Sequence, residues 1–509
     1  MSSEASPPSG GAPKRRAPRK TSAGKPPRRG AAARRTEPSS PRDALHRAAA
    51  GAAATAAAGR PRRPAVETGP FGGPLTSAEA KALDARAVAL RDQPPHLAAL
   101  KAMDDASLRR LATELGAPLA ERLGRRELMF ETLKLLVRRD GLAYGDGVLE
   151  VLPDGYGFLR SSAESYLASP DDVYVSPSQV RRFGLRTGSR VEGQVRPPKP
   201  QEKFFALMRV EAVDGEPPEE AARRPHFEDL PPAHPTARLR LETSPETTST
   251  RVIDLLAPVG KGQRALIVAP PRSGKTILLE EISHGLAANH PEVEQILLLV
   301  DERPEEAAEL RRKVKAEVIA STFDDVQSRH LQIAELVLQR ARRLVEAGRD
   351  VVILLDSLTR LARAFNADAP HTGRVLSGGV DAAALQRPKR FFGAARAVEG
   401  GGSLTVIATA LIDTGSRMDE VIFEEFKGTG NLEIVLDRSL AERRLFPAFD
   451  VLASGTRKEE LLLHPDELRR INLLRSVMAR LEPAEALELL LGQMRRAKTN
   501  VELLLSIRG

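Results

Sequence analysis

The residues with the clearest potential for chemistry form one short stretch, Ala269-Pro270-Pro271-Arg272-Ser273-Gly274-Lys275-Thr276. It lies between an apolar run at 265–268 and a run at 277–282 that suits a helix. The pattern G-x-x-x-x-G-K-[ST] is met at three of its four anchoring positions, with Ala269 in place of the first Gly. Backbone N–H groups of such a loop surround a phosphate chain. We therefore expect ATP to be bound by Pro271, Arg272, Ser273, Gly274, Lys275, Thr276 and Ile277.

Within this loop, two side chains have distinct expected roles. Lys275 should reach the β- and γ-phosphates, and the Thr276 hydroxyl should bind Mg²⁺. A helix that begins near Lys275 adds the positive end of its dipole. The alternative is a plain strand–turn–helix in which Gly274 only permits the turn.

Two acidic residues follow other apolar runs. Asp356 closes the run 351–355, and Glu302 follows the run 296–301. Ligands of an open parallel sheet bind beyond the carboxyl ends of its strands. Asp356 is therefore expected to hold Mg²⁺, and Glu302 to activate a water for attack on the γ-phosphate. Asp356 could instead cap a strand, and Glu302 could instead belong to a helix start, because Pro304 follows it.

A site that hydrolyses ATP also needs a cation at the transition state, often one from a neighbouring subunit. Arg303, Arg444 and Arg457 are candidates. Many other Lys and Arg residues compete with them, and most charged residues are simply solvated. Spacing alone therefore does not choose among the three.

Composition sets limits on the rest of the chain. Its 509 residues leave room for about three domains. There is no Cys, which excludes disulfides and agrees with the reducing cytoplasm, where we expect the protein to act. No apolar run approaches the roughly 18 residues of a membrane span, so no membrane association is expected. The net charge is +9, but residues 1–75 hold 15 Lys and Arg against 4 Asp and Glu, so the remainder is nearly neutral.

Sequence patterns divide the chain into five segments. Residues 1–75 have few large apolar side chains and are expected to form a disordered basic tail, which either binds nucleic acid nonspecifically or stays solvated. Residues 76–141 predict a small helical domain, with helices at 77–92, 97–101, 105–115 and 125–138. Residues 142–215 predict an OB or cold-shock-like β-barrel with strands at 148–152, 157–159, 172–175, 190–195 and 204–210. Residues 216–250 are interpreted as a linker.

Residues 251–509 alternate strand and helix patterns. Apolar runs suit strands that are buried on both faces of a mostly parallel sheet. The expected strands are 265–269, 296–301, 317–320, 351–356, 404–409 and 432–436, and the last 50 residues are expected to be helical. The fold class is therefore multidomain α/β, with a P-loop ATPase domain that ends in helices.

Several further motifs occur together with the loop at 268–276. They are Asp154-Gly155-Tyr156-Gly157-Phe158-Leu159-Arg160, Asp171-Asp172-Val173-Tyr174-Val175-Ser176-Pro177-Ser178-Gln179, and the segments 301–306, 377–381, 410–420 and 454–460. With them, the chain from about Asp146 to Leu462 closely resembles the bacterial Rho family of transcription termination factors. The helical segment before it resembles the N-terminal helical domain of that family. The Ala269-Pro270-Pro271 opening is usual for this family, although Arg272 stands where many relatives have Lys.

The resemblance implies a homohexameric ring of RecA-like motor domains with ATP sites between subunits. Arg457 matches an arginine finger donated across the interface, and Arg444 matches a second arginine that faces the phosphates. Arg303 matches an arginine beside the catalytic glutamate, and Phe446 matches an aromatic residue stacked on adenine. The catalytic set implied in this way is Glu302, Lys275, Arg457, Arg444 and Arg303, with Thr276 and Asp356 at the metal.

The resemblance also implies two sets of RNA contacts. The barrel set is Tyr156, Phe158, Arg160, Asp172, Tyr174, Glu202 and Phe204, in which aromatic faces would stack pyrimidines and polar groups could select cytosine edges. Tyr156 replaces a Phe that is common in the family. Because Tyr156 and Phe158 share one strand face, they could instead fill the barrel core. The motor set is Val375, Ser377 and Arg417, on central-pore loops at 373–385 and 413–420 that could otherwise be plain surface loops.

The expected activity is that of an ATP-driven RNA translocase or helicase. It would bind nascent cytosine-rich single-stranded RNA and terminate transcription by the RNA polymerase elongation complex. One alternative is a subunit of a membrane-linked rotary ATPase, which is expected to have a Gly-rich loop in place of Pro270-Pro271. The other is a non-motor RNA-binding regulator with a degenerate ATP site. The intact Lys275, Glu302 and Asp356 argue against that second alternative.

Overall fold

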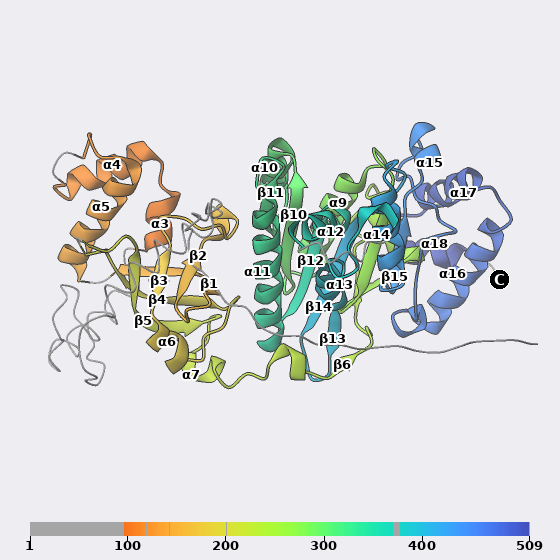
Figure 1. The fold of residues 1–509 in the computed structure, drawn as a ribbon. Helices are drawn as coiled ribbons and strands as arrows, with labels where there is room; N and C mark the ends of the chain where they lie inside the picture. The colour runs from red at the N-terminus through yellow and green to blue at the C-terminus, as the bar shows by residue number, and fades with distance from the viewer. Residues whose placement is uncertain (1–95, 118–119, 142, 200, 370–376, 508–509) are drawn as a thin grey trace, which may run out of the picture. The chain divides into compact units, whose positions relative to one another are not determined.

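The computed structural model describes residues 96–117, 120–141, 143–199, 201–369 and 377–507 (Figure 1). The predicted tail at 1–75 and the predicted helix at 77–92 lie outside the described residues. No helix of the described part of the chain is long and apolar enough to cross a membrane.

A small helical module begins the described chain. Its helices are α3 Leu97–Ala102, α4 Asp105–Glu114 and α5 Arg125–Asp140. Asp104 caps α4 by accepting a hydrogen bond from the Ser107 N–H, and α5 ends at Gly141, whose φ of 82° suits glycine. Leu108, Leu128 and Leu133 are fully buried. The three predicted helices in this span are confirmed within two residues.

A five-stranded barrel follows the helical module. Its strands close in the order β1-β2-β3-β5-β4. They are β1 Ala143–Val151, β2 Gly157–Arg160, β3 Val173–Val175, β4 Arg190–Arg196 and β5 Phe205–Val213, with η1 Ser162–Glu164 and α6 Pro177–Arg182 in the connections. The core is apolar and includes Leu149, Leu159, Val175 and Phe205. The predicted barrel is confirmed.

The segment at 216–250 is more structured than the predicted linker. It holds α7 Pro218–Ala221, η2 Phe227–Asp229, β6 Pro232–Ala233 and β7 Arg238–Leu239, and leads into α8 Thr248–Leu256. Phe227 is buried, and its N–H donates to Glu346 Oε1 at 2.7 Å. Leu239 and Leu241 are buried in the motor core. These few apolar residues are isolated in a Pro- and Glu-rich stretch, so no periodic pattern in the sequence predicts that they are buried against the motor.

The motor is built on a central sheet in the order β11-β10-β12-β14-β9-β15-β16. All neighbours in this path are parallel except β16, which pairs antiparallel with β15. The strands are β9 Arg264–Ala269, β10 Glu294–Glu302, β11 Glu317–Thr322, β12 Asp350–Asp356, β14 Ser403–Leu411, β15 Leu432–Val435 and β16 Gly455–Thr456. The six predicted strands are confirmed. The short β8 Val259–Gly260, β13 Arg396–Val398 and β16 were not predicted, because two or three residues carry no readable period.

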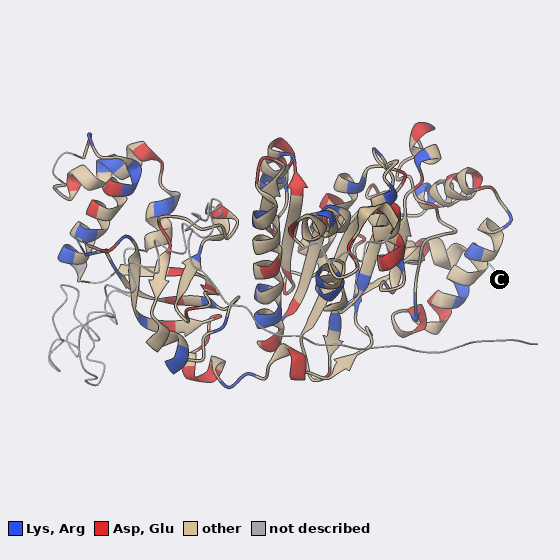
Figure 2. Ribbon diagram, viewed as in Figure 1, with Lys and Arg blue, Asp and Glu red and all other residues tan. Residues whose placement is uncertain are grey.

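Helices cover both faces of this sheet. Successive strand residues alternate between two apolar cores, so that Leu297 and Leu299 join one core whereas Ile296 and Leu298 join the other. The first core includes residues of α8, α9 Lys275–Asn289 and α10 Pro304–Lys313. The second includes residues of α11 Gln327–Glu346, α12 Leu358–Asp368, α13 Gln386–Gly393 and α14 Arg417–Lys427. Figure 2 shows the middle of the sheet without charge and the charged residues mainly on helices and at strand ends.

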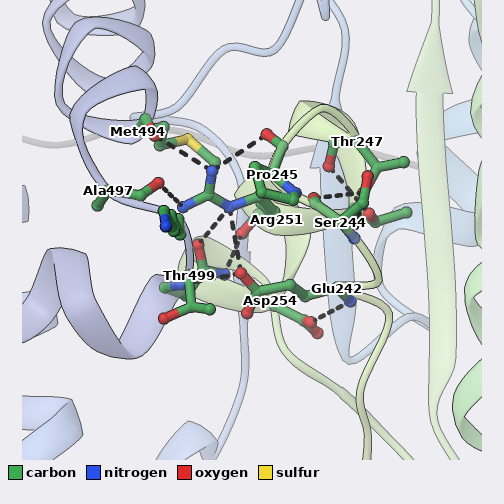
Figure 3. Close-up of polar contacts among 12 residues, drawn as sticks. Glu242, Ser244, Pro245, Thr247, Arg251, Asp254, Met494, Ala497 and Thr499 are labelled. Carbon is green, nitrogen blue, oxygen red and sulfur yellow. Dashed lines mark hydrogen bonds and ion pairs between the residues drawn. The ribbon is translucent and has the colours of Figure 1, made fainter.

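The C-terminal helices are held to the motor by a buried arginine. They are α15 Arg438–Glu442, η4 Glu459–Leu461, α16 Pro465–Met478, α17 Pro483–Arg496 and α18 Asn500–Ser506. Arg251 of α8 is wholly buried and donates to the Met494 carbonyl at 3.2 Å, the Ala497 carbonyl at 3.1 Å and Asn500 Oδ1 at 3.2 Å (Figure 3). Glu242 Oε1 lies 3.2 Å from its Nε. A paired and hydrogen-bonded charge of this kind is costly to remove, so Arg251 ties the end of α17 and the start of α18 to α8.

Asp254, on the same helix, is expected to make the free energy of unfolding depend on pH. It is almost fully buried, its Oδ1 has no hydrogen-bond partner, and burial raises its pKa from 3.8 to about 6. The folded state therefore binds the proton more tightly than the unfolded state, and stability falls as pH rises from about 4 through 6. Between pH 5 and 7, the free energy of unfolding of Asp254→Asn minus that of the wild type should rise by about 1 kcal/mol.

Urea unfolding at several pH values measures this difference. Asp466→Asn is the matched control, because Asp466 is solvent-exposed at the start of α16. If the difference in free energy of unfolding between Asp254→Asn and the wild type stayed constant with pH, the raised pKa would not belong to Asp254.

Candidate nucleotide and RNA sites

The phosphate-binding loop follows β9 and ends at the start of α9. Gly274 has φ 92° and Arg272 has φ 67°, so two residues of the loop adopt the left-handed conformation. The Ser273 hydroxyl donates to the Pro270 carbonyl at 2.8 Å and is buried, which closes the turn. Ala269 is the buried last residue of β9. The loop therefore places the first N–H groups of α9 at the carboxyl edge of the sheet, where anions bind.

Lys275 joins the ends of three strands. Its Nζ lies 2.6 Å from Asp356 Oδ2, 3.5 Å from Glu302 Oε2 and 3.4 Å from the Thr276 hydroxyl. Asp356 is fully buried and also accepts a hydrogen bond from the Thr409 hydroxyl at 2.8 Å. The structure thus brings together Lys275 and Thr276 after β9, Glu302 at the end of β10 and Asp356 at the end of β12, as the sequence predicted.

Glu302 has a buried carboxylate oxygen that accepts no hydrogen bond, although the Lys275 ammonium lies 3.5 Å from it. Only 3% of the residue is exposed, and Oε2 has no hydrogen-bond partner. A bulge in the pairing of β10 with β11 precedes it, and Asp301 within that bulge has φ 56°. Burial, and next the negative charge of Glu302, raise the pKa of Glu306. A buried carboxylate oxygen without a hydrogen-bond partner is suited to accept a proton from a water molecule.

Arg444 and Phe446 lie at the same edge of the sheet as the phosphate-binding loop. They follow β15 and α15, and β15 runs parallel to β9. Phe446 is 51% exposed, so its ring is open to a ligand. Arg303 is also exposed at this edge, next to Glu302, and its Nη1 lies 3.7 Å from Glu306.

Arg457 lies at the opposite end of β9. Its N–H donates to the Asn431 carbonyl at 2.9 Å, and the Asn431 side chain accepts from the Arg264 N–H at 2.8 Å. Arg264 is the first residue of β9, whereas the phosphate-binding loop follows the last. A strand of this length spans about 20 Å. Arg457 is therefore exposed at a place from which it does not reach the loop of its own chain.

The oxygen atoms at this site fit a magnesium ion. Asp356 supplies a buried carboxylate, and Thr276 supplies a hydroxyl beside Lys275. Carboxylate and hydroxyl oxygens, completed by phosphate oxygens and water, are the donors that Mg²⁺ prefers.

In the barrel, aromatic rings form one cluster on the β2–β3 face. Phe158 pairs in register with Tyr174, and its ring centroid lies 4.8 Å from that of Phe204. The centroid of Tyr156 lies 5.7 Å from that of Tyr174. Leu159 and Val175, not Phe158, belong to the barrel core. The cluster therefore lies on the face of β2 and β3 opposite Leu159 and Val175, and within it the rings of Tyr156 and Phe158 are themselves buried, with 3% and 4% of each residue exposed.

Charged groups border this aromatic cluster, here called the stacking cluster (Tyr156, Phe158, Tyr174 and Phe204). The Arg160 guanidinium lies over the Phe158 ring and pairs with both Asp172 and Glu150. Asp172 is fully buried, its Oδ1 has no hydrogen-bond partner, and burial raises its pKa. Glu202 accepts two hydrogen bonds from Arg196. Unsatisfied polar atoms beside aromatic faces can recognise the edges of stacked bases.

Two loops of the motor meet each other. The described part of the first loop is residues 377–385, which begin with η3 Ser377–Gly379. The second loop connects β14 to α14. A side chain at Gly378 would place its Cβ 2.8 Å from the Arg417 carbonyl, so the two backbones are in contact. Ser377 and Arg417 are exposed there. Val375, also predicted to contact RNA, lies outside the described residues.

Comparison with known proteins gives a consistent result. Residues 145–219 match the Rho termination factor RNA-binding domain, and residues 249–456 match the nucleotide-binding domain of the ATP synthase alpha/beta family. Transcription termination factor Rho of Chromobacterium violaceum is 55% identical over 408 residues, which cover 80% of this chain and 98% of that protein. The same factor of Aquifex aeolicus is 56% identical over 409 residues, which cover 80% of this chain and 94% of that protein. The chain belongs to the Rho family of transcription termination factors.

Family membership confirms the resemblance and the fold class derived from the sequence. The chain combines an RNA-binding barrel with a P-loop ATPase domain. The match at 249–456 on its own would also fit a rotary ATPase subunit. The RNA-binding domain at 145–219 and the relatives' length and identity favour the Rho family instead.

Some residues of the site could not be found by sequence reasoning. Glu150 and Arg196 hold two of the predicted RNA-binding side chains, and Thr409 holds Asp356. All three are ordinary polar residues within strands. Alternation along β1 and β4 places Glu150 and Arg196 on a definite face, and this is the only signal in the sequence that could have singled them out.

Proposed function

We propose that this protein is an RNA-stimulated ATPase that moves along nascent cytosine-rich single-stranded RNA and ends transcription by acting on the RNA polymerase elongation complex. One observation carries the proposal. The same chain holds an RNA-binding barrel with a stacking cluster and a motor in which Lys275, Asp356 and Glu302 meet. A protein that only stored or sensed RNA would have no need of a buried carboxylate oxygen without a hydrogen-bond partner beside a phosphate-binding lysine.

Each step of ATP hydrolysis has a candidate group. Backbone N–H groups of the loop and Lys275 would hold the β- and γ-phosphates, and Phe446 would stack on adenine. Glu302 Oε2 would accept a proton from the attacking water. Thr276 and Asp356 would hold Mg²⁺, which neutralises charge that develops on the phosphates. Arg303 and Arg444, exposed at the same edge, would add positive charge near the phosphates.

The position of Arg457 supports a ring. Because it lies at the far end of β9, it could contribute to hydrolysis only at the ATP site of another subunit. This supports a homohexamer whose ATP sites lie between subunits and which acts in the cytoplasm, where nascent transcripts are made. RNA would first stack on the barrel cluster and then reach the two motor loops that carry Ser377 and Arg417.

The test is the rate of ATP hydrolysis with and without single-stranded RNA. Oligocytidylate should raise the rate at least about tenfold, because RNA in the ring completes the arrangement of the ATP sites. Oligoadenylate of equal length is the matched control for base selection and should stimulate less. Phosphate release under saturating ATP measures both.

Two outcomes would contradict the proposal. If no RNA changed the rate of ATP hydrolysis, the proposed translocase activity would be wrong. If the protein bound RNA but did not hydrolyse ATP, the result would favour a non-motor RNA-binding regulator. A strand-displacement assay on an RNA–DNA hybrid then separates a helicase from an ATPase that only senses RNA.

A further inference from the structure

Helix α12 presents a polar stripe to the two motor loops. Thr359, Arg363 and Asn366 are spaced at i, i+4 and i+7, which places them on one side of a helix. The helix begins directly after Asp356, and Ser357 caps it by accepting a hydrogen bond from the Arg360 N–H at 3.2 Å. Its first turn is therefore fixed at the ATP site.

The end of the stripe holds the first loop. Asn366 accepts a hydrogen bond from the Asp381 N–H at 2.8 Å and donates one to the Gly379 carbonyl at 3.2 Å. One side-chain amide thus satisfies a donor and an acceptor of the loop backbone on either side of Val380. Both bonds are to main-chain atoms, so they fix the loop conformation and not merely a side chain.

The middle and start of the stripe hold the second loop. Arg363 donates two parallel hydrogen bonds to Asp419, at 2.7 Å and 2.5 Å. Asp419 is almost fully buried and also accepts a hydrogen bond from the Thr414 hydroxyl at 2.6 Å. The Thr359 hydroxyl accepts from the Leu411 N–H at 2.9 Å, where β14 ends and the loop begins.

We propose that Arg363 and Asn366 are positioning residues which hold the two motor loops in their RNA-receiving conformation as one unit. The contact between Gly378 and the Arg417 backbone joins the loops directly, and α12 fixes each of them from behind. The inference rests on the proposed function, because it takes these loops as the place where RNA is received.

The physical consequence concerns the cost of binding RNA. A loop held in place by its own protein loses little conformational freedom when RNA arrives, whereas a released loop must be ordered at that moment. Loss of the anchors should therefore raise the RNA concentration needed for activation. It should leave the rate at saturating RNA close to that of the wild type, since the ATP site itself is intact.

The variants are Asn366→Ala and Arg363→Lys in the full chain. Asn366→Ala removes two hydrogen bonds, and about a tenfold rise in the oligocytidylate concentration for half-maximal ATPase stimulation is expected. Arg363→Lys keeps the charge but not the fork-shaped pair with Asp419, and a rise of about threefold is expected. Asp368→Asn is the matched control, because Asp368 lies on the same helix, is exposed and, among the described residues, pairs only with Arg387, at 3.7 Å.

Hydrogen exchange without RNA gives a second readout that does not depend on catalysis. In Asn366→Ala, amides at 377–385 and at 412–420 should both exchange faster than in Asp368→Asn, because the loops are held as one unit. Faster exchange in the first loop alone would overturn the claim that they act together. A second contrary result is that RNA stimulates the wild type while neither variant changes the RNA concentration for half-maximal stimulation. That result would overturn the positioning role and leave the proposed function in place. A wild type that RNA does not stimulate would instead overturn the proposed function.

Discussion

Replacing Glu302 by glutamine should lower the rate of ATP hydrolysis by about 10³-fold while ATP binding persists. The change keeps the shape of the side chain and removes its ability to accept a proton. Glu302 Oε2 is buried, has no hydrogen-bond partner and lies 3.5 Å from the Lys275 ammonium. No other carboxylate of the described residues combines that burial with that freedom at the end of β10. Single-turnover phosphate release, with ATP affinity from a fluorescent ATP analogue, measures both quantities.

Binding should not weaken in this variant, because the glutamine removes a negative charge from the neighbourhood of the phosphates. A loss of affinity would mean that Glu302 orders the loop through Lys275, not that it activates water. The two roles thus predict opposite changes in affinity.

Glu306→Gln is the matched control for this experiment. Glu306 lies four residues further along, in the first turn of α10, and burial and the charge of Glu302 raise its pKa. Its carboxylate is close enough to Glu302 to experience the same local charges, but it pairs with Arg303 at 3.7 Å. Hydrolysis that falls as much in Glu306→Gln as in Glu302→Gln would show that local charge, and not proton transfer from water, limits the rate.

Sequence patterns could place the candidate ATP-site residues at one edge of the sheet because buried parallel strands have a recognisable pattern. The runs 296–301 and 351–355 are continuously apolar, and residues just after such runs share one edge of the sheet. Glu302, Asp356 and Lys275 could therefore be placed together before any coordinate was known. Their partner Thr409 could not, because a hydroxyl in the middle of β14 has no pattern of its own.

The barrel shows where the patterns leave a question open. Spacing by two places Tyr156 and Phe158 on one face, but it does not say whether that face is inside or outside. The register of β2 with β3 decides it, since Leu159 and Val175 fill the core. Long-range polar contacts, such as that of Glu150 with Arg160, follow from strand pairing and are equally invisible in one sequence.

Replacing Arg457 by alanine should lower ATP hydrolysis by about 10³-fold, comparable with the loss of an arginine finger. The effect would be surprising within one chain, because Arg457 lies beside Arg264 at the start of β9, opposite the phosphate-binding loop. It is explained if the guanidinium enters the ATP site of a neighbouring subunit. Arg457 is exposed on the described surface, as such a donated group must be.

Mixing two inactive variants tests the direction of this donation. Subunits with Arg457→Ala keep an intact loop, Lys275 and Glu302, whereas subunits with Glu302→Gln keep an intact Arg457. A mixed ring then contains some interfaces in which a complete loop faces a complete arginine, and single-turnover hydrolysis should return at those sites. Action of Arg457 within its own subunit predicts no recovery at any mixing ratio.

A second mixture makes the result specific to the interface. Lys275→Ala and Glu302→Gln both damage the half of the site that carries the phosphate-binding loop, so every interface in their mixture is defective. This mixture should stay inactive under the conditions in which the first recovers. Recovery in both mixtures would contradict the assignment of Lys275 and Glu302 to the same half of the site. Recovery in the first alone requires that each ATP site be built by two subunits, with Arg457 as the contribution of the second.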